Sequence, residues 1–405
     1  MTTRQFDITI VGAGPVGVVA ALAAVQAGFS VVLLEAANEI DTSPRAATTH
    51  PSTLELIERV GLLDRFKAEG LAARHFDFRD RESNELIARF DHALLEGETP
   101  HPYVVQTEQH KLARMGIDAL QTYAEAEVHF GTRVEALVQN DDGVTITAQG
   151  PGGPQTFASK YAIGADGGRS TVRKMLGIEF EGMTWPEKFI VLTVLDDFEQ
   201  MLGASLRNYL ADPEEWVNLF KVSGDDGLGR WRAVFPSKEH ESDEEAHDVV
   251  KVEARLQRLY AKPEPYRLLH TNIYRVHQRV AKTFRGGRVF LAGDSAHVNN
   301  PIGGLGLNCG IHDAMELIDT LVEVTQKGPN ASLLDRYERR RRRMNIEFVQ
   351  QQTIINKKRL EQKDPAARKV ALDELRATAD NPARHKAFLM RSSLIESVRE
   401  SKHIE

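Results

Sequence analysis

The feature that most constrains the fold is the hexapeptide Gly-Ala-Gly-Pro-Val-Gly at residues 12–17. It follows a β-rich run, Phe6 to Val11, and it precedes an Ala- and Val-rich helical pattern, Val16 to Ala27. A second apolar strand is expected from Ser30 to Glu35. These segments form one β-α-β unit with a glycine-rich turn between its first strand and its helix.

Each glycine of this turn has a physical role. Gly12 allows the tight turn, Gly14 lets backbone N–H groups approach a pyrophosphate at the helix N-terminus, and Gly17 permits close packing of helix on strand. Glu35 lies 18 residues after Gly17, at the end of the second strand, where it would accept hydrogen bonds from ribose hydroxyls. The pattern predicts a bound dinucleotide, and by itself it leaves NAD and FAD open.

Composition narrows the class of protein. The 405 residues are 41% hydrophobic and carry a formal charge of -7, which argues against a nucleic-acid partner. The N-terminus runs directly into a strand without a secretory signal pattern, and the apolar run Val16 to Val25 is too short to span a bilayer. The single cysteine, Cys309, excludes an internal disulfide and a cysteine-rich zinc site. We therefore expect a cytoplasmic protein without a membrane partner.

Two later motifs also end apolar strands in Gly/Asp turns. The first is GADGGRSTVRK, residues 164–174, and the second is RVFLAGDSAHVNNPIGGLGLN, residues 288–308. Taken singly, each is explained by turn geometry, because Asp and Gly favour turns at strand ends.

Together, in this order and spacing, the three motifs resemble the class A, single-component FAD-dependent aromatic hydroxylases, the monooxygenase family related to p-hydroxybenzoate hydroxylase. The resemblance covers roughly Asp7 to Asp335. It implies FAD as the dinucleotide, NADH or NADPH as a transient reductant, and O2 and an aromatic small molecule as substrates. In such enzymes the reduced flavin captures O2 as a C4a-hydroperoxide, whose terminal oxygen attacks an electron-rich ring, so no catalytic metal is implied.

The resemblance also assigns cofactor contacts in this chain. Asp294 would accept from the ribityl hydroxyls, Pro301 would lie against the isoalloxazine ring, and the helix that begins near Asn308 would stabilise an anionic reduced flavin through its positive N-terminus. The predicted FAD-binding residues are Gly12, Gly14, Pro15, Val16, Gly17, Glu35, Arg45, Gln109, Asp166, Gly293, Asp294, Pro301, Gly304, Gly306, Leu307 and Asn308.

No motif identifies the group that acts on the substrate hydroxyl. A phenolate is attacked faster than a phenol, so a base or relay near that hydroxyl is expected. His50, Tyr209 and Pro301 are the catalytic candidates, and Trp231 and Phe235 are the candidates for substrate contact. For Tyr209 and Trp231, core packing is the competing interpretation.

The predicted fold class is α/β: a Rossmann-like FAD-binding domain of the glutathione-reductase type, interleaved with a β-sheet substrate domain and followed by C-terminal helices. We assign residues 1–74, 104–182 and 283–330 to the FAD domain and residues 75–103 and 183–282 to the substrate domain. Residues 331–405 form a charged helical segment, which is compatible with a solvated surface or with a homodimer contact.

Three functions follow from the sequence. The first is hydroxylation of a small phenolic or N-heteroaromatic ring. The second is a flavin monooxygenase or epoxidase acting on a larger polycyclic or antibiotic-like substrate. The third is a non-catalytic dinucleotide sensor or an electron-transfer flavoprotein. The strand-rich segment from Met183 to Val276 would separate the first two, because small side chains there would make room for a larger ligand.

Overall fold

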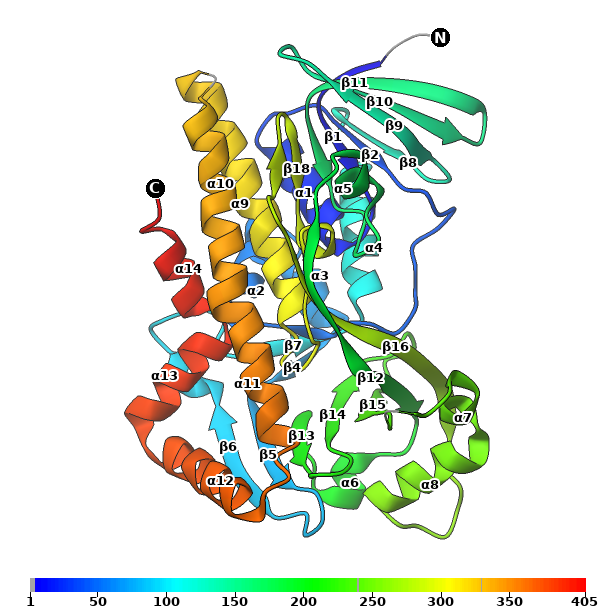
Figure 1. Ribbon diagram of the computed structural model, residues 1–405, viewed down its shortest axis with the longest axis vertical. Coiled ribbons are helices and arrows are strands. Elements are labelled where there is room, and N and C mark those ends of the chain that lie inside the picture. The colour runs from blue at the N-terminus through cyan, green and yellow to red at the C-terminus, as the bar shows by residue number, and fades with distance from the viewer. Residues whose placement is uncertain (1–3, 239, 329) are drawn as a thin grey trace.

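The computed structural model describes residues 4–238, 240–328 and 330–405, and it places two large sheets toward opposite ends of an elongated molecule (Figure 1). The first sheet is built around the dinucleotide-binding unit. β1 (Arg4–Val11) lies between β2 (Val31–Leu34) and β11 (Gly153–Gly164), and all three strands are parallel. The four residues of β2 are buried and apolar, as expected for a parallel strand covered on both faces.

The other strands of this sheet extend it on either side. β8 (Ala126–His129) pairs with β2, and β18 (Val289–Leu291) pairs with β11, both in parallel. The antiparallel additions are β9 (Arg133–Gln139), β10 (Val144–Gly150) and β17 (Arg285–Gly286). The strand order β18-β11-β1-β2-β8 brings the ends of β1, β11 and β18, and thus all three sequence motifs, to one edge of the parallel core.

Three helices cover the first sheet. α1 (Pro15–Gln26) packs between α4 (Gln109–Leu120) and α9 (Leu305–Lys327). Every residue of α1 from 17 to 25 is buried, because the helix is apolar on all sides. At Gly116 a Cβ atom would lie 2.1 Å from Val18 Cγ1, so this glycine allows α4 to approach α1 closely.

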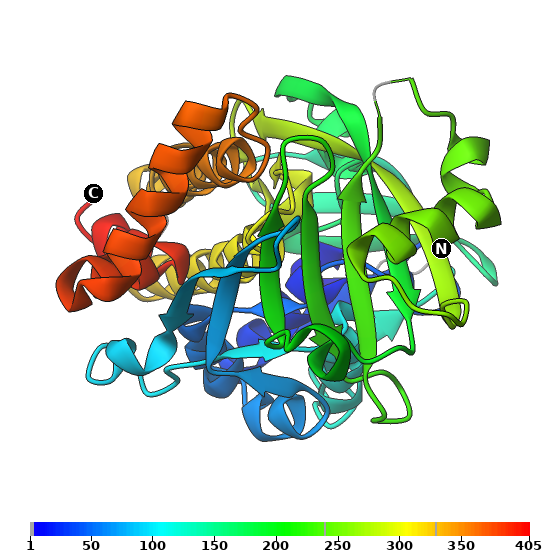
Figure 2. The same cartoon turned by 90° about the horizontal axis from the view of Figure 1, so that it is seen from below.

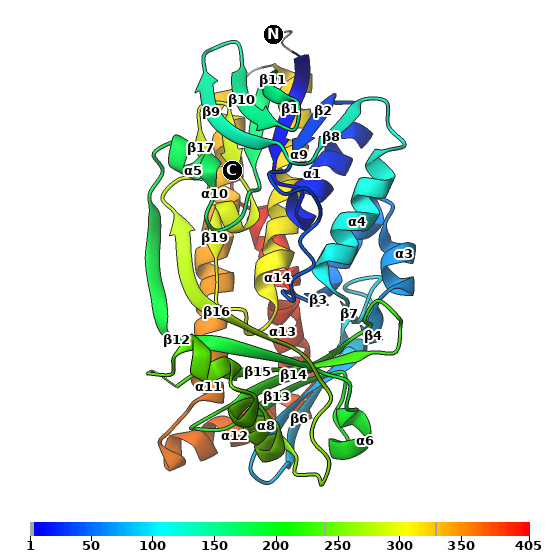
Figure 3. The same cartoon turned by 90° about the vertical axis from the view of Figure 1, so that its right-hand side faces the viewer.

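The second sheet has eight strands. Two of these, the long strands β12 (Phe180–Val194) and β16 (Leu268–Ala281), pair with each other and extend from this sheet toward the first one (Figure 3). The others are β5 (His75–Asp80), β6 (Leu86–Asp91), β13 (Arg207–Ala211), β14 (Val217–Val222), β15 (Arg230–Pro236) and β19 (His297–Val298). β5 and β6 form an antiparallel hairpin, and β5 also pairs in parallel with β13.

Short elements complete both regions. One small sheet joins β3 (Thr48–Thr49), β4 (Leu71–Ala73) and β7 (Val104–Gln106). Two helices, α7 (Asp243–His247) and α8 (Val249–Leu259), follow β15, and α8 packs on the outer face of the second sheet. The remaining short helices are α2 (Pro51–Arg59), α3 (Leu63–Ala68), η1 (His92–Leu95), α5 (Thr171–Met175), α6 (Phe198–Leu202) and η2 (Gly293–Ser295).

The C-terminal segment is helical, as predicted. α10 (Ala331–Met344), the π-helical η3 (Asn345–Gln350) and α11 (Gln351–Leu360) follow one another beside α9. The chain then turns back through α12 (Pro365–Asp380), α13 (Pro382–Ser392) and α14 (Ile395–Ser401). α12 lies beside β6 of the second sheet, as the view from below shows (Figure 2), whereas α14 contacts α2 and α10. The α/β fold class is confirmed, and the domain boundaries given above stay a prediction.

Within the described ranges, the longest helices lack the apolar content that crossing a bilayer would require.

Candidate functional site

A cavity of about 630 Å³ lies between the first sheet and the inner face of the second. Its volume is in the range of small-molecule and cofactor sites. At one end it is lined by Gly14, Pro15 and Val16 of the glycine-rich turn, and at the other by aromatic side chains of the second sheet. Between these ends its wall includes Arg45, Gln109, Gly167, Gly168, Asp294, Pro301, Gly304, Gly306 and Leu307.

The glycine-rich turn leaves the N-terminus of α1 open to this cavity. Gly12 has φ +108°, and a Cβ there would lie 2.4 Å from the Ala165 carbonyl oxygen. A Cβ on Gly17 would lie 1.9 Å from the Gly12 oxygen, so both positions require glycine. A Cβ on Gly14, by contrast, would meet no protein atom within 4 Å. A pyrophosphate can therefore approach the free N–H groups of α1 above Gly14.

Glu35 braces the same turn. Its Oε2 accepts a hydrogen bond from Ala13 N and its Oε1 accepts one from Ala37 N, both at 2.8 Å. A carboxylate oxygen can accept more than one hydrogen bond, so both oxygens remain available to ribose hydroxyls. Glu35 is not among the residues that line the cavity, and its contact with the ribose stays a prediction.

Asp294 projects into the cavity from the turn that follows β18. Gly293 has φ +63°, which directs the chain into η2 and exposes the Asp294 side chain. Desolvation by the surrounding cavity walls raises the pKa of the Asp294 carboxyl, against the opposing effect of His297 and Arg45. Asp166, in the middle motif, instead caps α5: its Oδ2 accepts from Thr171 N at 2.6 Å and from Val172 N at 3.1 Å. Its role toward FAD stays a prediction.

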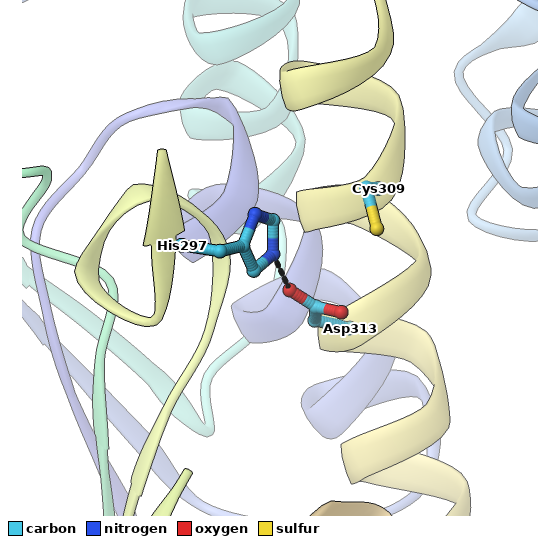
Figure 4. A group of neighbouring side chains, drawn as sticks. All are labelled: His297, Cys309 and Asp313. Atoms are coloured by element: carbon cyan, nitrogen blue, oxygen red, sulfur yellow. Dashed lines mark hydrogen bonds and ion pairs between the residues drawn. The ribbon is translucent and has the colours of Figure 1, made fainter. Parts of the chain in front are cut away.

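A buried ion-pair network lies directly behind the Gly293-Asp294 turn. Figure 4 shows His297 facing Asp313, with 2.6 Å between Nε2 and Oδ2. The same Oδ2 accepts from Gly293 N at 3.1 Å, and Oδ1 accepts from Arg341 Nε at 2.7 Å. The Asp313 carboxylate on α9 therefore connects the turn to Arg341 on α10.

His297, Cys309 and Asp313 resemble a set of metal ligands, but their surroundings disfavour a cation. Arg341 Nη2 and Asn345 Nδ2 both donate to Cys309 Sγ at 3.1 Å. Burial raises the pKa of the Cys309 thiol to about 12, so the protonated thiol is a poor metal ligand. The adjacent guanidinium supplies the positive charge that Asp313 requires, and we interpret the group as a structural ion pair.

The flavin end of the predicted site is formed by the turn before α9. Gly303 and Gly304 have φ +108° and +69°, and α9 begins at Leu305, three residues earlier than expected. Asn308 does not line the cavity with its side chain. It accepts from His50 N and donates to the Thr48 carbonyl, each at 2.8 Å, and so fastens the loop before α2 to the first turn of α9.

Alternation along the strands decides which side chains reach the cavity. Tyr209 on β13, Phe220 on β14, Val234 on β15 and Phe189 on β12 all line it, together with Trp216 immediately before β14. The next residues along these strands, such as Leu210, Leu219 and Phe235, belong to a separate core on the outer face. The inner face is therefore a mostly aromatic wall opposite Pro301.

The predicted substrate contacts Trp231 and Phe235 need correction. Both lie on the outer face of β15, buried against α6 and α8. Trp231 Nε1 donates to Asp197 Oδ1 at 3.0 Å, and its ring packs edge-on against Phe198. Their neighbours Arg232 and Val234 point the other way, because successive side chains of a strand alternate between faces. Trp216 supplies the indole that lines the cavity.

Tyr209 and His50 both line a smaller cavity that adjoins the large one. The Tyr209 ring stacks on Phe78 with centroids 5.0 Å apart, and Arg207 Nη2 donates to its Oη at 3.2 Å. Tyr209 also lines the large cavity, whereas His50 lines only the smaller one. Burial, reinforced by Arg207, lowers the pKa of His50 to about 3. His50 is therefore neutral at physiological pH.

Sequence reasoning missed the contribution of the C-terminal helices. Gln352, Asn356 and Leu360 of α11 and Phe388 of α13 line the smaller cavity. Phe388 also stacks on Phe90 of the second sheet, with centroids 4.2 Å apart. The only sequence signal for this contact is the apolar triplet at residues 388–390 in an otherwise charged segment.

Comparison with known proteins supplies independent evidence. A family model described as "FAD binding domain" matches residues 5–352. The chain is 36% identical over 364 residues to the para-nitrophenol 4-monooxygenase of Pseudomonas sp. strain WBC-3, with 89% of each chain covered. It is 33% identical over 366 residues to the 6-hydroxy-3-succinoylpyridine 3-monooxygenase of Pseudomonas putida, with 90% of this chain and 91% of the relative covered.

Solved structures show the same likeness. The p-nitrophenol 4-monooxygenase of Pseudomonas putida DLL-E4 superposes with a TM-score of 0.91 at 33% identity and covers 98% of this chain and 99% of its own. Aklavinone-11 hydroxylase, solved with FAD and aklavinone, superposes with a TM-score of 0.78 at 26% identity, covering 89% of this chain and 70% of its own.

Proposed function

The chain belongs to the family of FAD-binding domains matched over residues 5–352, and from this premise we propose that it is an FAD-dependent monooxygenase of small aromatic molecules. Its substrates are phenolic or N-heteroaromatic rings, its oxidant is O2, and its reductant is NADH or NADPH. The observation that carries the proposal is the single cavity that joins the N-terminus of α1 to an aromatic wall. A dinucleotide in that cavity would bring its flavin end to the wall, beside Pro301.

The residues present fit FAD. Gly14 and the N-terminus of α1 would hold the pyrophosphate, Glu35 the ribose, and Asp294 the ribityl hydroxyls. The N–H groups at the start of α9 would face the flavin ring, where the positive helix terminus favours a reduced, anionic flavin. Bound FAD would supply the redox chemistry that activates O2. The protein then has to position the ring, exclude water and stabilise negative charge on the substrate oxygen.

Tyr209 is the residue that we assign to the substrate oxygen. Tyr209 lines the cavity, and Arg207, which also lines it, donates a hydrogen bond to the Tyr209 hydroxyl. With a lone pair engaged by the guanidinium, the hydroxyl proton is free to bond an oxygen in the cavity. A phenolate there would also gain from the positive charge of Arg207, whose side chain is buried.

The walls favour a single small ring over a polycyclic substrate. Phe189, Trp216, Phe220 and Tyr274 project from the second sheet into the space opposite Pro301. Large side chains in this position leave less room than small ones, and FAD would occupy a large share of the same volume. The nearly full-length similarity to a nitrophenol monooxygenase and a pyridine-ring monooxygenase supports the same choice.

A turnover screen tests the proposal. The purified flavoprotein is mixed with NADH or NADPH and with nitrophenols, hydroxybenzoates, phenylpropanoids or hydroxypyridines. We expect at least one single-ring compound to stimulate NAD(P)H oxidation with matching O2 uptake and a hydroxylated product. Stimulation only by polycyclic compounds would favour the alternative substrate class, and NAD(P)H oxidation without product would contradict monooxygenation. The homodimer and the cytoplasmic location stay predictions.

Asp294→Ala is expected to weaken FAD binding by about 10- to 150-fold, since a hydrogen bond to a charged acceptor contributes about 1.5–3 kcal/mol. The measurement is the flavin-to-protein ratio after purification, followed by titration of the apoprotein with FAD. Asp319→Ala is the matched control: it removes an exposed aspartate of α9 that pairs with Arg59. Undiminished flavin content in Asp294→Ala would mean that another residue binds the ribityl hydroxyls.

Two tryptophans provide a test of the inner-face assignment. We expect Trp216→Ala to raise KM for a small phenol about tenfold or more and to admit larger rings, because its indole lines the cavity. Trp231→Ala should instead lower the free energy of unfolding by about 3–5 kcal/mol with little change in KM, because it empties the outer-face core. Equal KM effects of the two substitutions would contradict the assignment.

A further inference from the structure

The smaller cavity beside Tyr209 is lined mostly by apolar side chains, with a few buried polar groups among them. Its volume is about 20 Å³, enough for one water molecule. It lies where the loop before α2, η1, β13 and the C-terminal helices meet. Besides Tyr209, its charged or titratable side chains are those of His50, His92 and Arg207, and each of these three residues is more than nine-tenths buried.

Three polar atoms around this cavity have no hydrogen-bond partner within the described part of the chain: His50 Nδ1, His92 Nε2 and Arg207 Nη1. Leaving such buried groups without a partner is costly, and most buried polar groups in proteins have one. The Arg207 guanidinium is close enough to both imidazoles to help lower their pKa values.

The hydrogen-bonding role of each atom follows from its surroundings. His50 Nε2 lies 2.8 Å from the Gly303 carbonyl oxygen and His92 Nδ1 lies 2.9 Å from the Arg74 carbonyl oxygen. A carbonyl only accepts, so those nitrogens carry the protons and the other two present lone pairs. Burial first, and Arg207 second, lowers the pKa of each imidazole to about 3, so both stay neutral. The three unpartnered atoms therefore offer two acceptors and one donor.

This combination selects a neutral ligand with two donors. A cation would be repelled by Arg207, and an anion would face two lone pairs. We propose that His50, His92 and Arg207 bind a single water molecule that donates to both imidazoles and accepts from the guanidinium, and that they thereby position Tyr209. None of the three contacts would require either histidine to change its protonation state.

The consequence for Tyr209 rests on the proposed function. Arg207 Nη2 donates to Tyr209 Oη at 3.2 Å, and a water on Nη1 would fix the orientation of the whole planar guanidinium. The Tyr209 proton is then directed toward the substrate oxygen, where it stabilises the ionised form. His92 lies outside the large cavity, so it is a positioning residue that acts through the water and Arg207.

The test measures ionisation of a bound phenol rather than turnover. The FAD-loaded enzyme is titrated with pH in the presence of 4-nitrophenol and without NAD(P)H, and the phenolate is followed by its visible absorbance. We expect His92→Leu to raise the pKa of bound 4-nitrophenol by about one unit relative to the unmutated enzyme. His92→Gln, whose side-chain oxygen can accept from the water, should recover most of this shift.

His312→Leu is the matched control. His312 is also buried, but its Nε2 bonds the hydroxyls of Ser52 and Thr53 and it lines neither cavity. We expect it to leave the pKa of bound 4-nitrophenol unchanged. An unchanged pKa in an FAD-loaded His92→Leu variant would overturn the proposal.

A crystal structure of the unmutated holoenzyme supplies a measurement that does not depend on any variant. It should show one ordered water within hydrogen-bonding distance of all three atoms, and a smaller cavity without electron density would overturn the proposal. The failure of the proposed function is distinguishable from either result, since it would appear as an absence of hydroxylated product from the unmutated enzyme.

Discussion

Tyr209→Phe is expected to lower kcat by about 100-fold while FAD content stays at the level of the unmutated enzyme. The substitution keeps the ring that stacks on Phe78 and removes only the hydroxyl that Arg207 bonds. Loss of a group that handles the substrate proton or the resulting charge typically costs at least this factor. Steady-state kinetics with a phenol from the turnover screen, together with the flavin-to-protein ratio, measure both quantities.

The pH profile separates a chemical role of Tyr209 from a structural one. In Tyr209→Phe the rate should recover toward high pH, where the free phenol is already ionised before it binds. Tyr266→Phe is the matched control, because the Tyr266 hydroxyl donates to a backbone carbonyl on the outer face of the second sheet. If the Tyr209→Phe enzyme hydroxylates at an undiminished rate, the Tyr209 hydroxyl does not act on the substrate oxygen.

The cofactor end of the site could be predicted because its determinants are local. Gly12, Gly17 and Gly293 are required by close backbone approaches or by positive φ, and such requirements leave a mark in the sequence at fixed spacing. The order of the three motifs also fixes which strand ends meet, since parallel strands joined by crossovers bring their carboxyl ends to one edge.

The substrate end could not be predicted in the same way. In β15 the five residues from Trp231 to Phe235 are all buried, because one face packs on α8 and the other lines the cavity. A strand buried on both faces shows no alternation between polar and apolar residues, so its sequence does not reveal which side faces the ligand. The sequence pattern therefore did not show that Trp231 and Phe235 lie on the outer face.

The C-terminal helices posed a different problem. Their charged surface predicts contact with solvent, yet a few apolar positions and Arg341 are buried against the rest of the protein. A buried arginine can be recognised only when its partner is known, and Asp313 lies 28 residues away on another helix. No local pattern of residues therefore indicated that α10 supports the Gly293-Asp294 turn.

Arg341→Met should lower the free energy of unfolding by about 3–5 kcal/mol, the cost of leaving a buried charge without its partner. The methionine side chain fills nearly the same space as the aliphatic part of the arginine side chain, so the main change is the loss of the bonds to Asp313 and Cys309. Denaturant unfolding of the apoprotein at neutral pH measures the effect without a contribution from FAD binding. Arg339→Met, at an exposed position of the same helix, is the control.

The pH dependence of this loss identifies Asp313 as the group responsible. In the unmutated protein, burial would raise the pKa of Asp313, but His297 and Arg341 outweigh that effect and hold it below the usual value. Its contribution to stability is therefore present above the pKa of the unfolded chain and is lost as pH falls through the folded pKa.

In the Arg341→Met variant the pKa of Asp313 should rise, so the folded variant binds a proton more readily than the unfolded chain. The stability difference between the two proteins should then shrink as the pH is lowered, and adding Asp313→Asn to Arg341→Met should recover part of the loss at neutral pH. A pH-independent difference would mean that lost packing, rather than the uncompensated carboxylate, destabilises the variant.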